Sequence, residues 1–531
     1  MFQKDRVPQM HASIKTVAFR GIDTIPVEVQ VHVANGLPAM AIVGLADKAV
    51  AESRERVRAA LASIGLALPP KRIAINLAPA DVVKEGAHYD LPIALGLLVA
   101  IGTVPADAVD GAFVLGELSL HGGIEPVSGV LPAAMAAVGA GMDLICPQAC
   151  GPEAAWASDL GIVAAPDLMS LLNHLRGSQM LALPGPELLP AAHQAPDMSD
   201  LKGQETARRV LEIAAAGQHN LLLVGPPGAG KSMLAARLPG LLPPLSPREA
   251  LDVTMLHSVA GQLPAGGLIQ TRPFRDPHHS ASMAALVGGG ARARPGEISL
   301  AHGGVLFLDE LAEFTRPVLD ALRQPLETGQ IVVARANHHV TYPARFQLVA
   351  AMNPCRCGYL GDPARACTRA PDCGRNYCAR ISGPMIDRFD MIIEVPEVSG
   401  SLLLHNAPGE PTVSVARRVA AARDFAGERD PEAPVDAASD ISGDGRALLE
   451  KAIETQSLSA RGFHRILGWR EQSRTSKGRT ALKDGILPRR WPIARCRCWR
   501  SLAVPPRWRP RSGPPRRFPT MPGFPARRSA R

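Results

Sequence analysis

Aromatic residues are scarce in this chain, because Phe, Trp and Tyr make up only 4% of its 531 residues. Proteins that bind single strands by base stacking need aromatic platforms, so we do not expect that mode of nucleic-acid contact. Long apolar runs are also lacking: the longest, residues 91–104, is too short to span a bilayer and contains Pro92. Charged residues precede any apolar stretch at the N-terminus, unlike in a secretory signal. We therefore expect a cytoplasmic protein that contacts no membrane.

The basic excess of the chain lies entirely at its C-terminal end. Residues 468–531 hold 16 Arg and 2 Lys but only two acidic residues, Glu471 and Asp484. The resulting positive charge of this segment exceeds the net charge of +9 for the whole chain. The remaining residues are therefore net acidic. This tail also holds four of the five Trp and ten Pro, without helical or strand periodicity. It is either a disordered basic arm that binds nucleic acid or the product of a frameshift near Gly468, which we favour.

A phosphate-binding loop follows a short apolar strand near the middle of the chain. Glycines let backbone N–H groups turn toward phosphate oxygens, a lysine adds positive charge, and a following serine can ligate Mg²⁺. The apolar run 221–224 leads into such a loop, followed by a helical stretch. The loop consists of Gly225, Pro226, Pro227, Gly228, Ala229, Gly230, Lys231 and Ser232. The sequence therefore predicts a site for ATP, with Mg²⁺ bound by Ser232.

Two further apolar strands end in residues that suit the same site. Residues 304–308 precede Asp309 and Glu310, and residues 346–352 precede Asn353. The first pair would hold Mg²⁺ (Asp309) and orient the attacking water (Glu310), and the amide of Asn353 would help to place that water. Runs without polar alternation are typical of buried parallel strands. We therefore predict a P-loop ATPase built on a parallel α/β sheet.

Additional motifs accompany these strands at residues 35–38, 42–45, 90–95, 352–355, 386–390 and 458–462. Together with the P-loop, they resemble the magnesium-chelatase-like AAA+ ATPases, and within them the YifB/ComM family, over about residues 10–467. The resemblance implies that Arg388 is an arginine finger for the ATP of a neighbouring subunit and that Arg461 is a second sensor of the γ-phosphate. It also implies a homo-oligomeric, hexameric ring. A surface ion pair with Asp387 or Asp390 is the alternative for Arg388.

The resemblance divides the chain into domains. It implies a Lon-protease-like (ribosomal S5-like) α+β domain at 1–180, a linker at 181–196, an AAA+ core at 197–400, a small helical lid at 401–467 and the basic tail at 468–531. Periodicity supports a strand at 27–33, a helix at 48–62 and a strand at 72–77 in the first domain. In the lid, apolar spacing predicts a helix at 446–457. A frameshift would cut the lid short and leave Arg461 poorly anchored.

The first domain lacks the dyad that a Lon-type peptidase needs. Its nucleophile position is His88 and its lysine position is Leu131, and neither side chain can perform the required step. We therefore expect a structural or DNA-engaging collar rather than a peptidase. His88 could pair with Asp90 as a base, but a turn histidine with satisfied hydrogen bonds is the better interpretation.

Two inserts are suited to contact DNA inside a ring. Residues 330–345 predict a β-hairpin, and Arg335, His338 and His339 near its tip would suit phosphate contacts that do not read sequence. The alternative is an ordinary solvated hairpin. Residues 274–294 form a glycine-rich basic insert, which fits either a mobile DNA contact or a flexible linker.

Five cysteines follow Asn353 within 24 residues: Cys355, Cys357, Cys367, Cys373 and Cys378. Four thiolates could hold a tetrahedral Zn²⁺, although the spacing is irregular and five candidates compete for four places. Reduced thiols without a metal are the alternative.

The function that fits these features is an ATP-driven ring motor on single-stranded or branched DNA. By the resemblance, it would be a helicase or branch-migration factor in recombination during natural transformation. One alternative is the motor subunit of a magnesium chelatase, which drives metal insertion into a tetrapyrrole. Another is a non-enzymatic DNA-binding or assembly protein whose truncated lid prevents turnover.

Overall fold

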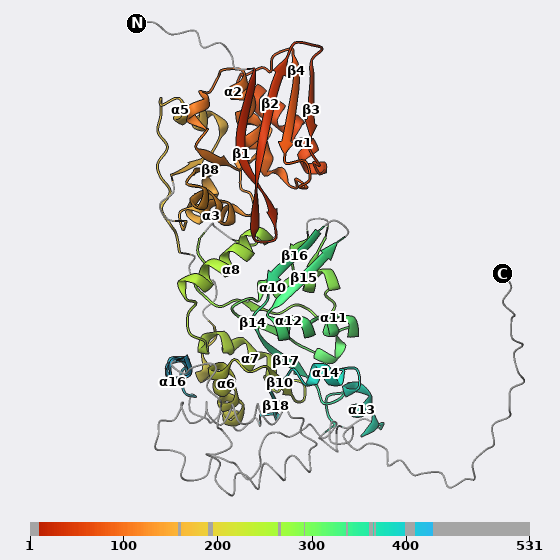
Figure 1. Cartoon of the computed structure of the whole chain (residues 1–531). Helices are drawn as coiled ribbons and strands as arrows, with labels where there is room; N and C mark the ends of the chain where they lie inside the picture. The colour runs from red at the N-terminus through yellow and green to blue at the C-terminus, as the bar shows by residue number, and fades with distance from the viewer. Residues whose placement is uncertain are drawn as a thin grey trace, which may run out of the picture.

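The computed structural model describes most of the first 427 residues of the chain. The described residues are 10–157, 161–188, 195–263, 267–290, 293–335, 338–360, 365, 368–398 and 409–427. They form two units that lie end to end, with the N-terminal unit above the P-loop unit in Figure 1. Among the helices of these residues, none is long and apolar enough to cross a membrane.

The N-terminal unit is built on a mixed seven-stranded sheet. Its strands are β1 (His11–Arg20), β2 (Asp23–Ala34), β3 (Ala39–Val43), β4 (Arg72–Ala78), β5 (Ala112–Val114), β8 (Asp143–Pro147) and β9 (Ile162–Ala165), and β6 (Glu117–Leu118) and β7 (Ile124–Glu125) form a separate ribbon. The order is β3-β4-β2-β1-β5-β8-β9. β2 is antiparallel to β1 and β4, whereas β5 is parallel to β1. Alternate residues of β2 are buried, as the strand predicted at 27–33 requires.

Helices cover this sheet and complete an α+β unit. They are α1 (Lys48–Ser63), α2 (Asp90–Ala100), α3 (Val130–Ala140), α4 (Gly151–Ala154) and α5 (Leu168–Leu175). The predicted helix at 48–62 is confirmed as α1, which Asp47 caps by accepting a 2.8 Å bond from the Val50 N–H. Every residue of α2 is buried, because this helix packs on β1 and β2 and against α1. The strand predicted at 72–77 is confirmed as β4.

The P-loop unit contains a five-stranded sheet in which all strands are parallel, in the order β11-β14-β17-β10-β18. Its strands are β10 (Leu221–Val224), β11 (Phe274–Arg275), β14 (Val305–Leu308), β17 (Gln347–Met352) and β18 (Met391–Glu394). Two antiparallel hairpins lie outside the sheet, β12 (Gly288–Gly289) with β13 (Arg294–Pro295) and β15 (Gln330–Arg335) with β16 (His338–Pro343). This confirms the predicted parallel α/β core and the predicted hairpin at 330–345.

Both faces of the parallel sheet are covered, which explains its uninterrupted apolar strands. Leu221 and Leu223 face one core with α6 and α7, whereas Leu222 and Val224 face a second core on the other side. The helices of this unit are α6 (Glu205–Gly217), α7 (Lys231–Arg237), α8 (Pro247–Ala260), α9 (Met283–Val287), α10 (Glu297–Leu300), α11 (Arg316–Ala321), α12 (Arg323–Thr328), α13 (Asp372–Cys378), α14 (Gly383–Ile386) and α16 (Thr412–Gly427).

Among the described residues, the units meet at two main places. The first lies between α3 and α8, where the Ser258 hydroxyl donates to the buried Glu153 carboxylate and accepts a 3.1 Å bond from the Gly129 N–H. The second lies between the β1–β2 turn and the hairpin β15–β16. A Cβ at Gly21 would come within 2.6 Å of Val340 Cγ1. The hairpin therefore extends toward the N-terminal unit and packs against it (Figure 1).

The predicted lid is described only in part. Helix α16 packs against α6, and Arg418 holds it there through Glu212 and Glu410. The predicted helix at 446–457, the sensor candidate Arg461 and the tail at 468–531 lie outside the described residues.

Candidate functional site

The P-loop has the backbone that a phosphate cradle needs. It joins the buried strand β10 to the start of α7, and Gly228 and Gly230 have φ angles of 75° and 78°. A side chain would be strained in that left-handed region. Gly225 lies so close to β18 that a Cβ there would be 2.2 Å from the Val395 carbonyl oxygen. Glycine is therefore required for conformation at two positions and for space at a third.

Lys231 is buried at the first position of α7 and points back over the loop. Its Nζ donates to the carbonyl oxygens of Gly225 and Pro226 at 2.8 Å and to Asn353 Oδ1 at 3.1 Å. Burial lowers the pKa of Lys231, while the nearby Asp309 and Glu310 carboxylates oppose that shift. The ammonium is thus held by neutral acceptors that phosphate oxygens can replace.

Two oxygen ligands suitable for Mg²⁺ lie together beside the loop. The Ser232 hydroxyl donates a 2.8 Å hydrogen bond to Asp309 Oδ2, although the two residues are 77 positions apart. Hydroxyl and carboxylate oxygens are the donor set that Mg²⁺ prefers next to phosphates. The residues therefore fit the predicted ion, which Ser232 and Asp309 would hold.

Glu310 adopts a rare backbone conformation at the end of β14. Its φ is 51°, and its N–H donates a 2.8 Å bond to Asp309 Oδ1. This geometry turns the exposed Glu310 side chain away from the strand, and its Oε2 lies 3.2 Å from Nδ1 of His279. Since residues with positive φ other than glycine cluster at functional sites, the turn supports a role for Glu310.

A single cavity of about 350 Å³ brings these residues together. It lies where β10, β14 and β17 end, the edge at which ligands bind in open parallel sheets. Its lining consists of Pro227, Gly228, Ala229, Gly230, Lys231, Ser232, Met233, Asp309, Glu310, Met352 and Asn353. The structure therefore places Asn353 beside Lys231 and the two acids, as expected from the sequence.

Arg388 lies apart from this cavity. It follows α14 and forms an ion pair with Glu327 of α12, not with either neighbouring aspartate as the alternative interpretation required. Its side chain is only 14% exposed, and its buried Nε has no hydrogen-bond partner. Arg388 therefore does not contribute to the lining of the cavity in its own chain.

Comparisons with known proteins agree with this geometry. Family models for magnesium chelatase subunit ChlI match residues 29–150 and 197–403, and the C-terminal model of that subunit matches residues 409–469. The uncharacterized protein YifB of Salmonella typhimurium is 45% identical over 414 residues, which cover 78% of this chain and 81% of the relative. Competence protein ComM of Haemophilus influenzae is 43% identical over 470 residues, covering 86% of this chain and 92% of ComM.

The chain belongs to the YifB/ComM family. It is therefore a magnesium-chelatase-like AAA+ ATPase, and this family assignment implies the use of ATP and Mg²⁺. A more distant match, the magnesium-chelatase 38 kDa subunit of Rhodobacter capsulatus, is 29% identical over 173 residues, which cover 29% of this chain and 49% of the subunit. The likeness of the N-terminal unit to a Lon protease domain stays a prediction.

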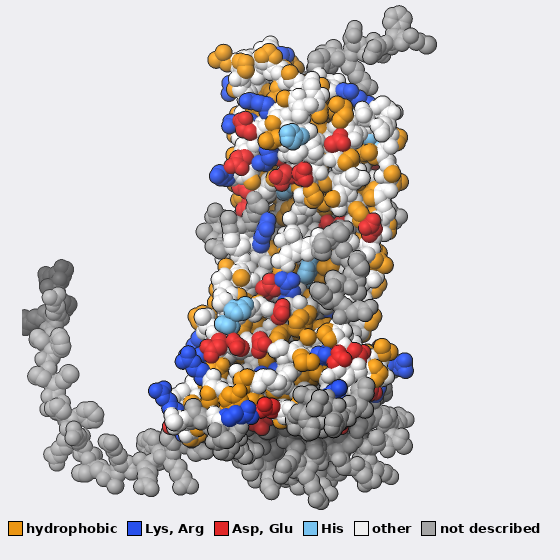
Figure 2. Space-filling view, turned by 180° about the vertical axis from the view of Figure 1, so that it is seen from behind, with side chains coloured by type: hydrophobic (Ala, Val, Ile, Leu, Met, Phe, Trp, Pro, Cys, Tyr) orange, Lys and Arg blue, Asp and Glu red, His pale blue; other side chains and the backbone are white. Residues whose placement is uncertain are grey.

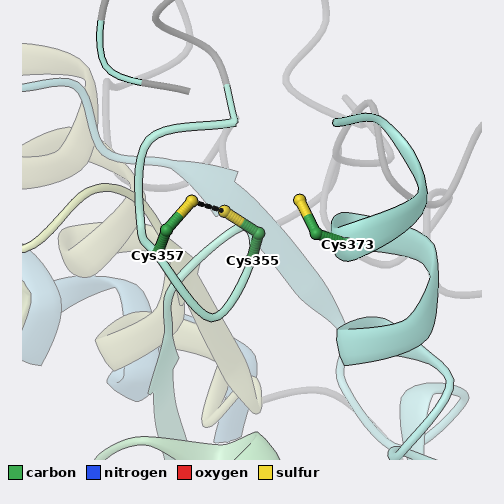
Figure 3. Close-up of side chains that lie close together, drawn as sticks. All are labelled: Cys355, Cys357 and Cys373. Atoms are coloured by element: carbon green, nitrogen blue, oxygen red, sulfur yellow. Dashed lines mark hydrogen bonds between the residues drawn. The ribbon is translucent and has the colours of Figure 1, made fainter. Parts of the chain in front are cut away.

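In this YifB/ComM protein, the predicted cysteine cluster is partly assembled. The Sγ atoms of Cys355, Cys357 and Cys373 all lie within 4.8 Å of one another (Figure 3). Cys378 does not join them, because five residues of helix α13 turn it to another side, where it is buried in the hydrophobic core. Cys367 lies outside the described residues. The structure thus brings three of the five predicted ligands together, and metal binding stays a prediction.

The candidate DNA-contacting residues fall on the confirmed hairpin. Arg335 pairs with His338 at its tip, and His339 pairs with Ala334 one step further along. The second insert, expected to be a loop, instead contains α9 and the hairpin β12–β13. Its backbone is closely packed there, since a Cβ at Gly296 would come within 2.3 Å of the Gly288 nitrogen.

His88 is a structural residue, as expected from the sequence. It is buried next to Phe19 and Tyr89, and its Nε2 lies 2.9 Å from the Val17 carbonyl oxygen. Asp90 instead forms an ion pair with Arg56, in which Arg56 Nε lies 2.5 Å from Asp90 Oδ2. The two side chains therefore engage different partners. Leu131 is fully buried in α3.

Three residues around the nucleotide site were not assigned a role from the sequence. His279 contacts Glu310, Glu327 pairs with Arg388, and the Gln204 amide donates to the Ala229 carbonyl under the P-loop. All three partners are distant in sequence, so local patterns carry no signal for them.

Proposed function

We propose that this YifB/ComM protein is an ATP-driven ring motor on DNA, acting as a helicase or branch-migration factor in recombination. The observation that carries the proposal is the cavity at the ends of β10, β14 and β17. It joins a phosphate-binding loop, a Mg²⁺ donor pair and two water-placing residues. The name of the Haemophilus relative, a competence protein, supports a role in natural transformation.

Each residue of the cavity would have a separate role in ATP hydrolysis. Lys231 would exchange its carbonyl acceptors for phosphate oxygens, and Ser232 with Asp309 would hold Mg²⁺, which neutralises charge on those oxygens when bound. Glu310 would orient the attacking water and take its proton, with Asn353 fixing the other side of that water. His279 would restrain the Glu310 carboxylate until it turns toward the cavity.

Assembly would complete the site. Charge that develops on the transferred phosphoryl group is stabilised by a guanidinium, and Arg388 lies outside the cavity of its own chain. In a ring, Arg388 would leave Glu327 and enter the cavity of the adjacent subunit. We propose a hexamer, in which hydrolysis depends on subunit contact. Arg461 would contact the γ-phosphate from the lid.

DNA would pass along the hairpin β15–β16. Acidic and basic side chains are interspersed over the face shown in Figure 2, so the described surface in that view offers no large basic patch for a duplex. The hairpin tip, in contrast, carries Arg335, His338 and His339. Contacts to phosphates from such residues position DNA without selecting a sequence.

DNA-stimulated ATP hydrolysis by the full chain tests the proposal. We expect branched DNA to raise turnover by about tenfold or more, with strand displacement that requires ATP. Glu310→Gln serves as the control, since residual turnover in that variant would come from a contaminant. Binding of DNA without any hydrolysis would support the non-enzymatic alternative and contradict the motor.

A second function, the motor subunit of a magnesium chelatase, is favoured by the three ChlI family matches and by the Rhodobacter relative. The two functions differ in what accelerates hydrolysis. A chelatase motor would respond to the other chelatase subunits and their tetrapyrrole, and it would be indifferent to branched DNA. The same ATPase measurement with each partner in turn distinguishes them.

A further inference from the structure

Three cysteine sulfurs converge from two separate segments next to the nucleotide site. Cys355 and Cys357 lie in the loop after β17, and Cys373 reaches them from the first turn of α13 (Figure 3). Their Sγ atoms all lie within 4.8 Å of one another. Cys355 is fully buried, whereas Cys357 and Cys373 are half-buried. The cluster is thus closed on one side and accessible on the other.

The distances suit a shared metal ion better than a disulfide. Sulfur atoms on a tetrahedral zinc lie about 3.8 Å apart, given Zn–S bonds of about 2.3 Å. Cys355 Sγ and Cys357 Sγ are 3.0 Å apart, too far for a disulfide of about 2.05 Å. The third sulfur, Cys373 Sγ, lies within 4.8 Å of both, so one ion could contact all three.

The segment that holds these cysteines is anchored in the hydrophobic core near its two ends, by Leu360 and by Tyr377 with Cys378. Between Cys355 and Cys378, the only large apolar or aromatic residues are Tyr359, Leu360 and Tyr377. None of these three residues lies between Leu360 and Cys373, so the middle of the segment has no large apolar side chain that could hold it to the core. A metal that joins the loop to α13 would supply a cross-link there.

We propose that Cys355, Cys357 and Cys373 bind a structural Zn²⁺ as thiolates. Three converging thiolates favour zinc over Mg²⁺ or Ca²⁺, which prefer oxygen ligands. The proposal commits to these three protein ligands and to one ion, with a fourth ligand, such as water, completing the tetrahedron.

The location gives the ion a specific structural role. Cys355 is two residues after Asn353, and Gly358 of the same loop packs on Pro227 of the P-loop. A Cβ at Gly358 would come within 2.4 Å of Pro227 Cδ. On the other side, α13 leads directly to α14 and Arg388. The zinc would therefore fix the loop behind the P-loop and the segment that presents Arg388. This role, unlike the binding itself, rests on the proposed ATPase mechanism.

Metal analysis of the purified full chain tests the binding. We expect about one zinc per chain, falling to about a tenth or less in Cys355→Ser, Cys357→Ser and Cys373→Ser. Cys150→Ser in the N-terminal unit is the matched control, because Cys150 is also buried but lies in another core. Cys378→Ser is a second control on α13 itself. Both controls should keep the metal.

Absence of zinc from the unmodified chain, even after growth with added zinc, would overturn the proposal. So would iron in its place, a Cys355–Cys357 disulfide found by mass spectrometry, or zinc that persists in all three variants. Because a serine variant could fail to fold, cobalt exchange into the unmodified chain gives an independent readout. Three or more thiolates should produce strong visible absorption from tetrahedral Co²⁺, and a spectrum typical of oxygen ligands would contradict the assignment.

These measurements test the zinc proposal independently of the proposed motor function. Zinc content is measured without ATP or DNA, so a chain that binds zinc but ignores DNA would refute only the proposed function. Removal of the metal by a chelator should lower the melting temperature of the P-loop unit, since the ion binds the folded state.

Discussion

Each unit of the molecule buries a lysine, and the two lysines differ in what surrounds them. Lys84 of the N-terminal unit is fully buried and donates from Nζ to the Pro79 carbonyl oxygen, and burial lowers its pKa. Lys231 is 8% exposed, and burial lowers its pKa as well. Only Lys231, however, shares a cavity with Asp309 and Glu310. Burial and a lowered pKa therefore do not identify a functional lysine without the groups around it.

The same contrast holds for two histidines. His88 is enclosed by aromatic rings and a backbone carbonyl in the N-terminal unit, whereas His279 is half-buried beside the Glu310 carboxylate. In one unit the polar residues complete the fold, and in the other they meet around a space that a ligand can enter. The N-terminal unit contributes no side chain to the cavity lining.

The most direct test of this comparison removes one lysine and not the other. We expect Lys231→Ala to weaken ATP binding by about 100-fold or more, because the outer phosphates lose their only lysine partner in the cavity. Lys84→Ala should leave ATP binding within about threefold and instead lower stability by about 2 kcal/mol, through an unpaired Pro79 carbonyl. Fluorescent-nucleotide titration and thermal unfolding measure the two effects. Equal nucleotide affinity in both variants would contradict the assignment of Lys231, and not Lys84, to nucleotide binding.

Glu310→Gln should separate binding from chemistry within the same cavity. The amide keeps the size of the side chain but cannot accept a proton, so we expect turnover to fall by about 10²- to 10³-fold while ATP affinity is retained. Single-turnover hydrolysis with radiolabelled ATP, alongside equilibrium binding, provides the measurement. If turnover persists after the substitution, another residue must orient the water.

Arg388→Ala should show whether the cavity is complete within one chain. We expect normal ATP binding and a loss of turnover of about 10³-fold, the usual range for an arginine finger. Mixing Arg388→Ala with Glu310→Gln subunits should restore part of the activity. In the mixed ring, some cavities combine an intact Glu310 with an intact Arg388 from the neighbour. No recovery on mixing would assign Arg388 a role inside its own subunit.

Much of the nucleotide site could be predicted from the sequence, because its parts are local. A strand, a glycine-rich turn and a helix follow one another at Gly225–Ser232, and Asp309 and Asn353 directly follow their strands. Because the ends of parallel strands meet at one edge of the sheet, these local motifs are enough to predict that the residues lie together. The hairpin at 330–345 and the strands and helix of the N-terminal unit were predictable for the same reason.

The parts that could not be predicted depend on contacts between distant segments. Arg388 pairs with Glu327, 61 residues away, and not with the adjacent Asp387 or Asp390, because the fold brings the end of α12 next to the turn after α14. The glycine-rich insert looked flexible, but Ser282 caps α9 and the close approach of Gly288 and Gly296 fixes a hairpin. Likewise, spacing alone could not show that Cys378 turns away from the other cysteines.

The smallest predicted effect concerns the junction between the two units, where Glu153 is buried against Ser258 and the Leu131 N–H. Burial raises the pKa of Glu153 above its ordinary value of 4.5 despite these hydrogen bonds. Below pH 4.5 the carboxyl is protonated in both folded and unfolded chains, so it imposes no penalty. As pH rises through the raised pKa, the folded protein must bury a charge, and stability is lost.

Glu153→Gln should remove that dependence while keeping an acceptor for both hydrogen bonds. We expect the variant to be more stable than the unmodified protein by about 1 kcal/mol at neutral pH, and the difference to vanish toward about pH 4. Thermal unfolding of both proteins across this range gives the measurement, with the exposed Glu52→Gln as the matched control. If the difference in stability between the two proteins were the same at every pH, the charge on Glu153 would not be the cause of it. A difference that grows with pH would show that the N-terminal unit packs on the P-loop unit through a buried acid whose ionisation weakens the contact.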